Sequence, residues 1–153
     1  MSPDEQARAL VSVDLLDLIL KQGALASDPD AVLVALGRKF EALSAELAML
    51  QNEEEGLASQ DRRVERLESR AMFNPLIERI EGVLGLLDPI ERAIMAVPAK
   101  TVVGLGVKAR HAAQVLSNYW TDAPERLDWD ARAIRLLIES TCNVAGVDLL
   151  PSQ

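Results

Sequence analysis

The strongest constraint on the fold is a regular recurrence of apolar residues in two long segments. The first segment carries Val32, Leu36, Phe40, Leu43, Leu47 and Leu50, and the second carries Leu76, Ile80, Val83, Leu87, Ile90 and Ile94. The steps between neighbours are three or four residues, which is the spacing of one face of an α-helix. The sequence therefore predicts two long amphipathic helices that pack along their length, most simply as an antiparallel hairpin.

The composition also favours helices over sheets. Apolar residues make up 49% of the 153 residues and aromatic residues only 3%, and unbranched apolar side chains lose little rotamer freedom in a helix. We therefore expect an all-α fold, a helical bundle of about five helices in one domain over residues 1–153. Residues 1–27 would form an N-terminal helix and loop that could be exchanged with a partner, and residues 146–153 a frayed tail.

Proline, glycine and capping residues mark the ends of the first two helices. A first helix is predicted from Pro3 to Gln22, because Ser2 can cap it and Pro3 suits the first helical position. The Asp28-Pro29 pair predicts the start of the second helix. Gly56 predicts a break after that helix.

Two further prolines fall within the second apolar segment. Asn74-Pro75 predicts a helix start, and Asp88-Pro89 predicts a kink, or two nearly collinear helices, because the apolar phase continues past the proline. Pro98 is expected to end this segment. Thr101 is expected to cap a fourth helix over about residues 102–120.

The last two helices have predicted inner faces of their own. These are Val102, Leu105, Ala109, Ala112, Leu116 and Tyr119 in the fourth helix, and Ile134, Leu137, Ile138, Cys142 and Ala145 in a fifth helix that Asp128 can cap. Cys142 is the only cysteine, so an internal disulfide is excluded, and we expect a buried thiol.

Gly104 and Gly106, followed by Ala109, fit the letters of a dinucleotide-binding fingerprint. That fingerprint requires a strand before the first glycine and a βαβ unit around it. Here a helical pattern precedes the glycines and no second strand follows, so we expect no cofactor. Each glycine costs about 1 kcal/mol relative to Ala in a helix, and close packing of a neighbouring helix would offset that cost.

The turn before the fourth helix is the one candidate ligand site. A helix N-terminus attracts anions, and Lys100, Thr101 and Lys108 lie near this one. We therefore name these three residues as a candidate anion site. His111, the only histidine, has no acidic residue one turn away to orient it, so we expect a partly exposed side chain rather than a catalytic base.

The same segment carries a resemblance to known proteins. It resembles a segment of small, uncharacterised helical proteins of proteobacteria, in which a Pro-Ala-x-Thr turn precedes a Gly-Leu and a Lys-Ala pair. The matching positions are Pro98, Ala99, Thr101, Gly104, Leu105, Lys108 and Ala109. The resemblance implies a bacterial helical protein and no established activity.

The distribution of charge bears on nucleic-acid binding. The net charge is −8, which repels phosphate and makes general nucleic-acid binding a poor expectation. The exception is residues 92–121, which contain no acid. This segment carries Arg92, Lys100, Lys108 and Arg110, and ends near Tyr119 and Trp120, which could stack on bases.

Metal and membrane sites find little support in the sequence. One histidine is too few for most zinc or di-iron bundle sites, and the carboxylates of residues 53–55 point in different directions on a helix, so we expect no metal. No apolar run reaches the roughly 18 residues of a membrane span. The acidic start MSPDEQ is unlike a secretion signal, and we expect a cytoplasmic protein.

The function predicted from these features is a non-enzymatic helical interaction or structural protein that self-associates or binds a helical protein partner. The motivation is a surplus of long apolar faces without a convergent cluster of polar residues. Two alternatives stay open. One is a nucleic-acid-associated regulatory protein that uses residues 92–121, and the other is a protein, enzymatic or not, that binds an anion or small ligand at the Thr101 helix start.

Overall fold

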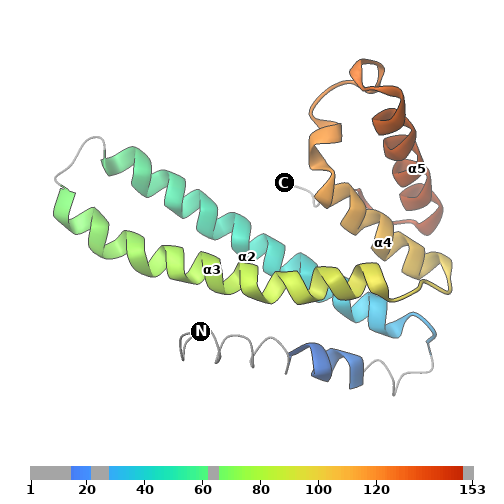
Figure 1. Ribbon diagram of the computed structural model, residues 1–153, viewed down its shortest axis with the longest axis horizontal. Helices are drawn as coiled ribbons and strands as arrows, with labels where there is room; N and C mark the ends of the chain where they lie inside the picture. The colour runs from blue at the N-terminus through green and yellow to red at the C-terminus, as the bar shows by residue number, and fades with distance from the viewer. Residues whose placement is uncertain (1–14, 22–27, 62–65, 150–153) are drawn as a thin grey trace. The chain divides into compact units, whose positions relative to one another are not determined.

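The protein is built from α-helices (Figure 1). The computed structural model describes residues 15–21, 28–61 and 66–149, without the side chains of residues 60–73. These residues contain no strand and form five α-helical segments: residues 15–21, α2 (Ala31–Asp61), α3 (Arg66–Ala96), α4 (Val102–Val115) and α5 (Trp129–Ala145). Two short 3-10 turns, η1 (Ser117–Trp120) and η2 (Pro124–Arg126), connect α4 to α5. The prediction of an all-α fold with about five helices is confirmed.

Part of the predicted first helix lies within the described residues. Residues 15–21 are helical, with Ile19 buried and Leu18 and Leu20 exposed. The predicted start at Pro3 and end before Gly23 lie outside the described residues.

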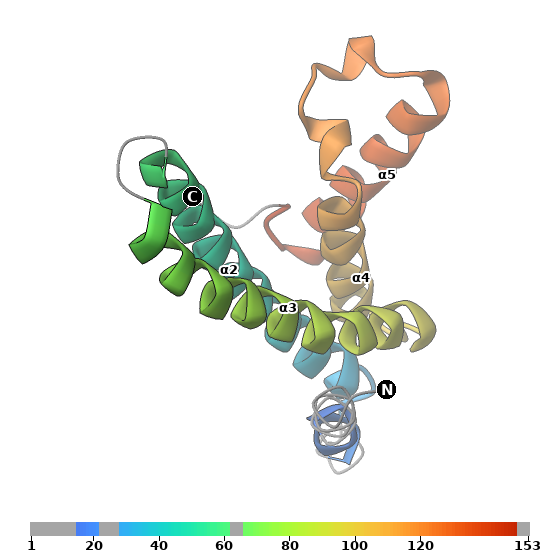
Figure 2. The same cartoon turned by 60° about the vertical axis from the view of Figure 1, so that its left-hand side comes forward.

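The chain divides into two compact units, of which the first comprises residues 1–18 and 38–92. Within it, α2 and α3 run side by side in opposite directions (Figures 1 and 2). Their buried residues in this unit are Phe40, Leu43, Leu50, Leu76, Ile80, Val83, Leu87 and Ile90. The apolar recurrence in the sequence thus marks the seam of the predicted antiparallel hairpin.

The helices of this hairpin are longer than the sequence predicts. α2 continues through Gly56 to Asp61, so the predicted break at Gly56 is wrong. α3 begins at Arg66 and runs through Pro75 and Pro89, so the predicted helix start at Asn74-Pro75 is also wrong. Each proline removes one backbone N–H donor, but the apolar residues on both sides stay in phase and bury the same face. This packing holds the helix together across the missing bonds.

The second unit comprises residues 19–37 and 93–153. Its centre is the contact between α4 and α5, which lie side by side (Figures 1 and 2). The core consists of Ala109, Ala113, Ile138 and Cys142, with Ala112, Leu116, Trp120, Val147 and Leu149 packed around it. Cys142 is buried as predicted. The prediction of one domain over residues 1–153 stays a prediction beside this division.

The predicted inner faces of α4 and α5 need correction. Val102 and Leu105 are exposed, and the buried residues of α4 are two glycines, two alanines and His111. In α5, Ile134 and Leu137 are exposed although the sequence predicts them inside. On α4 the two glycines make the closest contacts with neighbouring residues, and Val102, Val103 and Leu105 lie on the exposed side.

The ends of α4 and α5 show how each helix is capped. Thr101 is the N-cap of α4 as predicted, and α4 ends at Val115 before a 3-10 turn, five residues earlier than expected. Asp128 precedes α5, but its side chain makes no capping hydrogen bond.

At the C-terminal end of α5, Gly146 adopts a left-handed φ of 68°, and Val147 N–H donates to the Cys142 carbonyl at 3.1 Å. This is a Schellman motif. It folds residues 146–149 of the predicted tail against the core, and residues 150–153 lie outside the described residues.

Within the described part of the chain, no helix has both the length and the apolar character needed to cross a membrane.

Candidate functional site

The turn that leads into α4 binds a carboxylate, and the carboxylate comes from the protein itself. Asp30, which immediately precedes α2, is only 1% exposed. Its Oδ1 accepts from the Lys100 backbone N–H at 2.9 Å, and its Oδ2 accepts from the Thr101 N–H at 2.7 Å and from the Thr101 hydroxyl at 2.5 Å. The site predicted to attract an anion is therefore filled by Asp30 in this structure.

These hydrogen bonds favour the charged form of Asp30. The bond from the Thr101 hydroxyl lowers the pKa of Asp30 below its ordinary value, burial opposes that shift, and the N–H groups of Lys100, Thr101 and Gly104 lower the pKa further. A carboxylate that accepts several such bonds stays ionised. Thr101 also accepts from Gly104 N–H at 3.5 Å, so one hydroxyl links the cap of α4 to Asp30.

The short segment before α2 positions Asp30. The Asp28 carboxylate accepts from the Asp30 N–H at 2.9 Å, and the Asp28 carbonyl accepts from the Ala31 N–H at 3.2 Å. Pro29 between them has a fixed φ, which limits the conformations of this turn. The Asp28-Pro29 pair therefore begins a turn, and the helix itself begins at Ala31, slightly later than predicted.

Three glycines allow the close contacts around this turn. A Cβ atom on Gly104 would overlap the Asp30 carboxylate, with Cγ only 2.6 Å away, and one on Gly106 would lie 2.7 Å from the Ala145 Cβ. In the same way, a Cβ on Gly37 would lie 2.8 Å from Val107 Cγ1. Gly106 thus packs against a neighbouring helix, as the sequence predicts for both glycines, whereas Gly104 makes room for the Asp30 carboxylate.

The three residues of the candidate anion site do not converge. Lys100 contributes its backbone N–H and Thr101 contributes both backbone and side chain to Asp30. The Lys108 ammonium instead donates to the carbonyls of Ile94 and Met95, at 2.8 and 3.0 Å, and so caps the C-terminal end of α3. Binding of an external anion by these three residues stays a prediction, and Lys108 lends it no geometric support.

The two side chains best known for catalysis are buried. His111 is only 5% exposed, so the expectation of a partly exposed histidine is wrong. Burial lowers the pKa of His111, and the charge of Lys108 lowers it further, so the ring is neutral near pH 7. Burial raises the pKa of the Cys142 thiol more strongly than the charge of Arg110 lowers it. Cys142 is therefore a structural thiol and not an activated nucleophile.

Metal ligands do not gather in the part of the chain that the structure describes. No group of three or more histidine, cysteine, aspartate or glutamate side chains is placed there to hold a metal ion.

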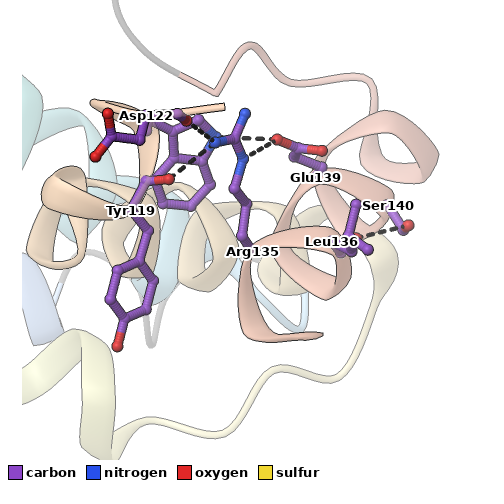
Figure 3. A network of polar contacts seen from close by, with 7 residues as sticks. Tyr119, Asp122, Arg135, Leu136, Glu139 and Ser140 are labelled. Carbon is purple, nitrogen blue, oxygen red and sulfur yellow. Dashed lines mark hydrogen bonds and ion pairs between the residues drawn. The ribbon is translucent and has the colours of Figure 1, made fainter. Parts of the chain in front are cut away.

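A second polar cluster joins α5 to the turn η1 (Figure 3). The Arg135 guanidinium donates to the carbonyls of Tyr119 and Asp122, both at 2.9 Å, and its Nε donates to Glu139 Oε1 at 2.8 Å. The Trp120 indole N–H donates to the same Glu139 oxygen at 3.1 Å, and Arg135 lies 5.5 Å from the centre of the Trp120 ring. This cluster fixes the orientation of α5 and uses the polar group of Trp120 internally.

The opposite side of α5 exposes a surface without charge. We call it the outer face of α5. At 3.6 residues per turn its members fall within an arc of about 100°, and they are Trp129, Ala133, Leu136, Leu137, Ser140 and Val144. Trp129 is 87% exposed, Val144 76%, Leu137 68% and Leu136 45%. The Ser140 hydroxyl donates to the Leu136 carbonyl at 2.8 Å, so the only polar side chain of this face is bonded within its own helix.

Sequence reasoning missed Asp30 and the outer face for different reasons. Asp30 and Thr101 are separated by 71 residues, and such a contact leaves no local pattern. The members of the outer face are visible in the sequence as apolar positions of α5, but their spacing predicts Leu137 on the inside of the bundle.

Comparison with known proteins finds no matching family model, no matching curated protein and no matching solved structure. The candidate sites therefore stand on their geometry.

Proposed function

We propose that the protein is a non-enzymatic helical interaction protein that docks on a protein surface through the outer face of α5. The observation that carries the proposal is the concentration of four large exposed apolar residues on one uncharged helix face. Contiguous exposed apolar surface of this kind is typical of protein–protein interaction sites. Trp is moreover enriched among the residues that dominate binding energy.

The exposed apolar residues of α4 do not form such a face. Val102, Val103, Leu105 and Val115 of α4 are exposed, but at 100° per residue they point in widely separated directions. Single exposed apolar side chains are normal on protein surfaces. The outer face of α5 differs because its members converge.

The inner contacts of α5 support a docking role. Ile138 and Cys142 anchor the helix in the core, and Arg135 ties it to η1. A helix held from behind presents its outer side chains in a fixed arrangement, which lowers the entropy cost of binding.

Nucleic-acid binding and ligand binding at the Thr101 helix start are less well supported, because several of the groups they would use are engaged within the protein. For nucleic-acid binding through residues 92–121, the Lys108 ammonium is engaged by two carbonyls and the Trp120 indole by Glu139 and Arg135. For a ligand at the Thr101 helix start, Asp30 holds the donors. His111 and Cys142 are both buried, which argues against a catalytic role for either side chain.

A photo-crosslinking amino acid at position 133 tests the proposal. Ala133 lies in the middle of the outer face, and Glu125, an exposed residue of η2, is the matched control position. In extracts of cells that produce the protein, we expect irradiation to link position 133 to a protein identifiable by mass spectrometry, while position 125 yields little product. Equal labelling at both positions, or no protein adduct at position 133, would contradict a docking role for this face.

A further inference from the structure

We infer that the outer face of α5 binds the same face of a second copy of this chain, with the two α5 helices antiparallel. The inference rests on the proposed function and adds the identity and orientation of the partner.

The positions of the outer face read the same from either end of the helix. Its members are residues 129, 133, 136, 137, 140 and 144, and the steps between neighbours are 4, 3, 1, 3 and 4. A helix that turns end over end about a two-fold axis between residues 136 and 137 therefore presents the same set of positions. A symmetric dimer requires a face that is complementary to itself in this way.

The sizes of the side chains match in this pairing. It places Trp129 opposite the partner's Val144, Ala133 opposite the partner's Ser140, and Leu136 opposite the partner's Leu137. The smallest residues thus face each other on both sides of the centre, where they allow the two helices to approach closely. The largest residue of each copy faces a smaller one at the end of the helix, so no layer holds two tryptophans.

The residues beside the outer face are also compatible with an antiparallel pair. In such a pair each flank of one helix meets the same flank of the other. Arg132 and Glu139 lie on one flank. Measured along the helix axes, Arg132 of one copy therefore lies about half a helical turn from the partner's Glu139. The Glu139 carboxylate stays bonded to Arg135 and Trp120 of its own copy, and Arg132 of the other copy adds a positive charge near it. The helix dipoles oppose each other favourably.

The size of the contact predicts the strength of the dimer. A helix of 17 residues is about 25 Å long, and one helix pair buries less surface than the roughly 1,600 Å² of a standard interface. We therefore expect a reversible dimer that forms at micromolar or higher concentration and not an obligate one.

Disulfide trapping tests the pairing and its direction together. Ala133→Cys and Ser140→Cys variants are prepared separately, in the full chain, and each is oxidised alone and in an equimolar mixture at about 0.1 mM, where a weak dimer is populated. The native Cys142 is fully buried and serves as an internal background. Circular dichroism confirms that both variants remain helical.

The antiparallel pair predicts a product in the mixture. Positions 133 and 140 face each other across the axis, whereas two copies of position 133 lie about 10 Å apart along the helices, beyond the reach of a disulfide. We expect about tenfold more disulfide-linked dimer in the mixture than in either variant alone. Efficient linkage of each variant alone would indicate a parallel pair and overturn the inference. Absence of any linked dimer would overturn it as well.

Failure of this inference is distinguishable from failure of the proposed function. If trapping fails while the photo-crosslinker at position 133 still joins an identified different protein, self-pairing is wrong and docking through α5 stands. If neither experiment yields a product, both proposals fall.

Discussion

At the scale of single residues, Asp30 holds the turn before α4 in place. Its carboxylate satisfies two backbone N–H groups and the hydroxyl of Thr101 at a buried position. Because the folded-state pKa is lowered, Asp30 stabilises the fold above its ordinary pKa of 3.8, and this contribution is lost as the pH falls through the lowered value.

An Asp30→Asn variant tests this role. The amide has one acceptor oxygen and adds donors that face donors, so we expect a clearly lower urea midpoint than wild type at pH 7. The difference should shrink below pH 3.8, where Asp30 of the wild type begins to be protonated in the unfolded chain. Asp122→Asn, at an exposed position, is the control and should change stability by less than about 0.5 kcal/mol. Equal stability of the two variants at pH 7 would contradict the role of Asp30.

The buried His111 is expected to make the free energy of unfolding depend on pH in a second, higher pH range. Its folded-state pKa lies below the ordinary 6.5, so the unfolded chain binds the proton first as the pH falls. The free energy of unfolding therefore decreases as the pH falls below about 6.5, by at most about 1.4 kcal/mol per pH unit. In urea denaturation at pH 7.5 and 5.5, His111→Gln should reduce this loss. An unchanged pH dependence in the variant would show that His111 does not titrate in this way.

At the scale of helices, apolar periodicity predicts the buried face of α3 correctly and that of α4 incorrectly. All six predicted apolar positions of α3, from Leu76 to Ile94, are buried, because a long helix against one neighbour follows simple periodicity. In α4 the neighbours approach so closely that Gly104 and Gly106 form the inner face and the larger Leu105 points outward. Periodicity cannot foresee this reversal, since it ranks residues by hydropathy and not by size.

A pair of glycine substitutions measures that close packing. Gly106→Ala places a Cβ 2.7 Å from the Ala145 Cβ, which cannot rotate away, so we expect destabilisation of about 1–3 kcal/mol. Gly82→Ala in α3 meets no atom within 4 Å and should stabilise the protein by about 0.5–1 kcal/mol. Thermal and urea denaturation provide both values. A neutral Gly106→Ala variant would mean that α4 and α5 are less tightly packed there.

At the scale of the whole molecule, the sequence predicts an interaction protein, and the surface proposed to carry that interaction is not among its predictions. The apolar spacing of α5 predicts Leu137 on the inside, and the structure instead places it on an uncharged outer face with Trp129, Leu136 and Val144. That outer face carries both the proposed docking role and the antiparallel self-pairing.

Sedimentation analysis over a range of concentrations tests the central claim, which is self-pairing through α5, most directly. We expect the wild-type mass to rise from monomer towards dimer, and Leu137→Lys to weaken dimerisation at least about tenfold, or 1.4 kcal/mol, by placing a charge at the two-fold axis. Val115→Lys changes a similarly exposed residue on α4 and should dimerise like wild type. A wild-type protein that stays monomeric at every concentration, or a dimer that Leu137→Lys leaves intact, would contradict the account.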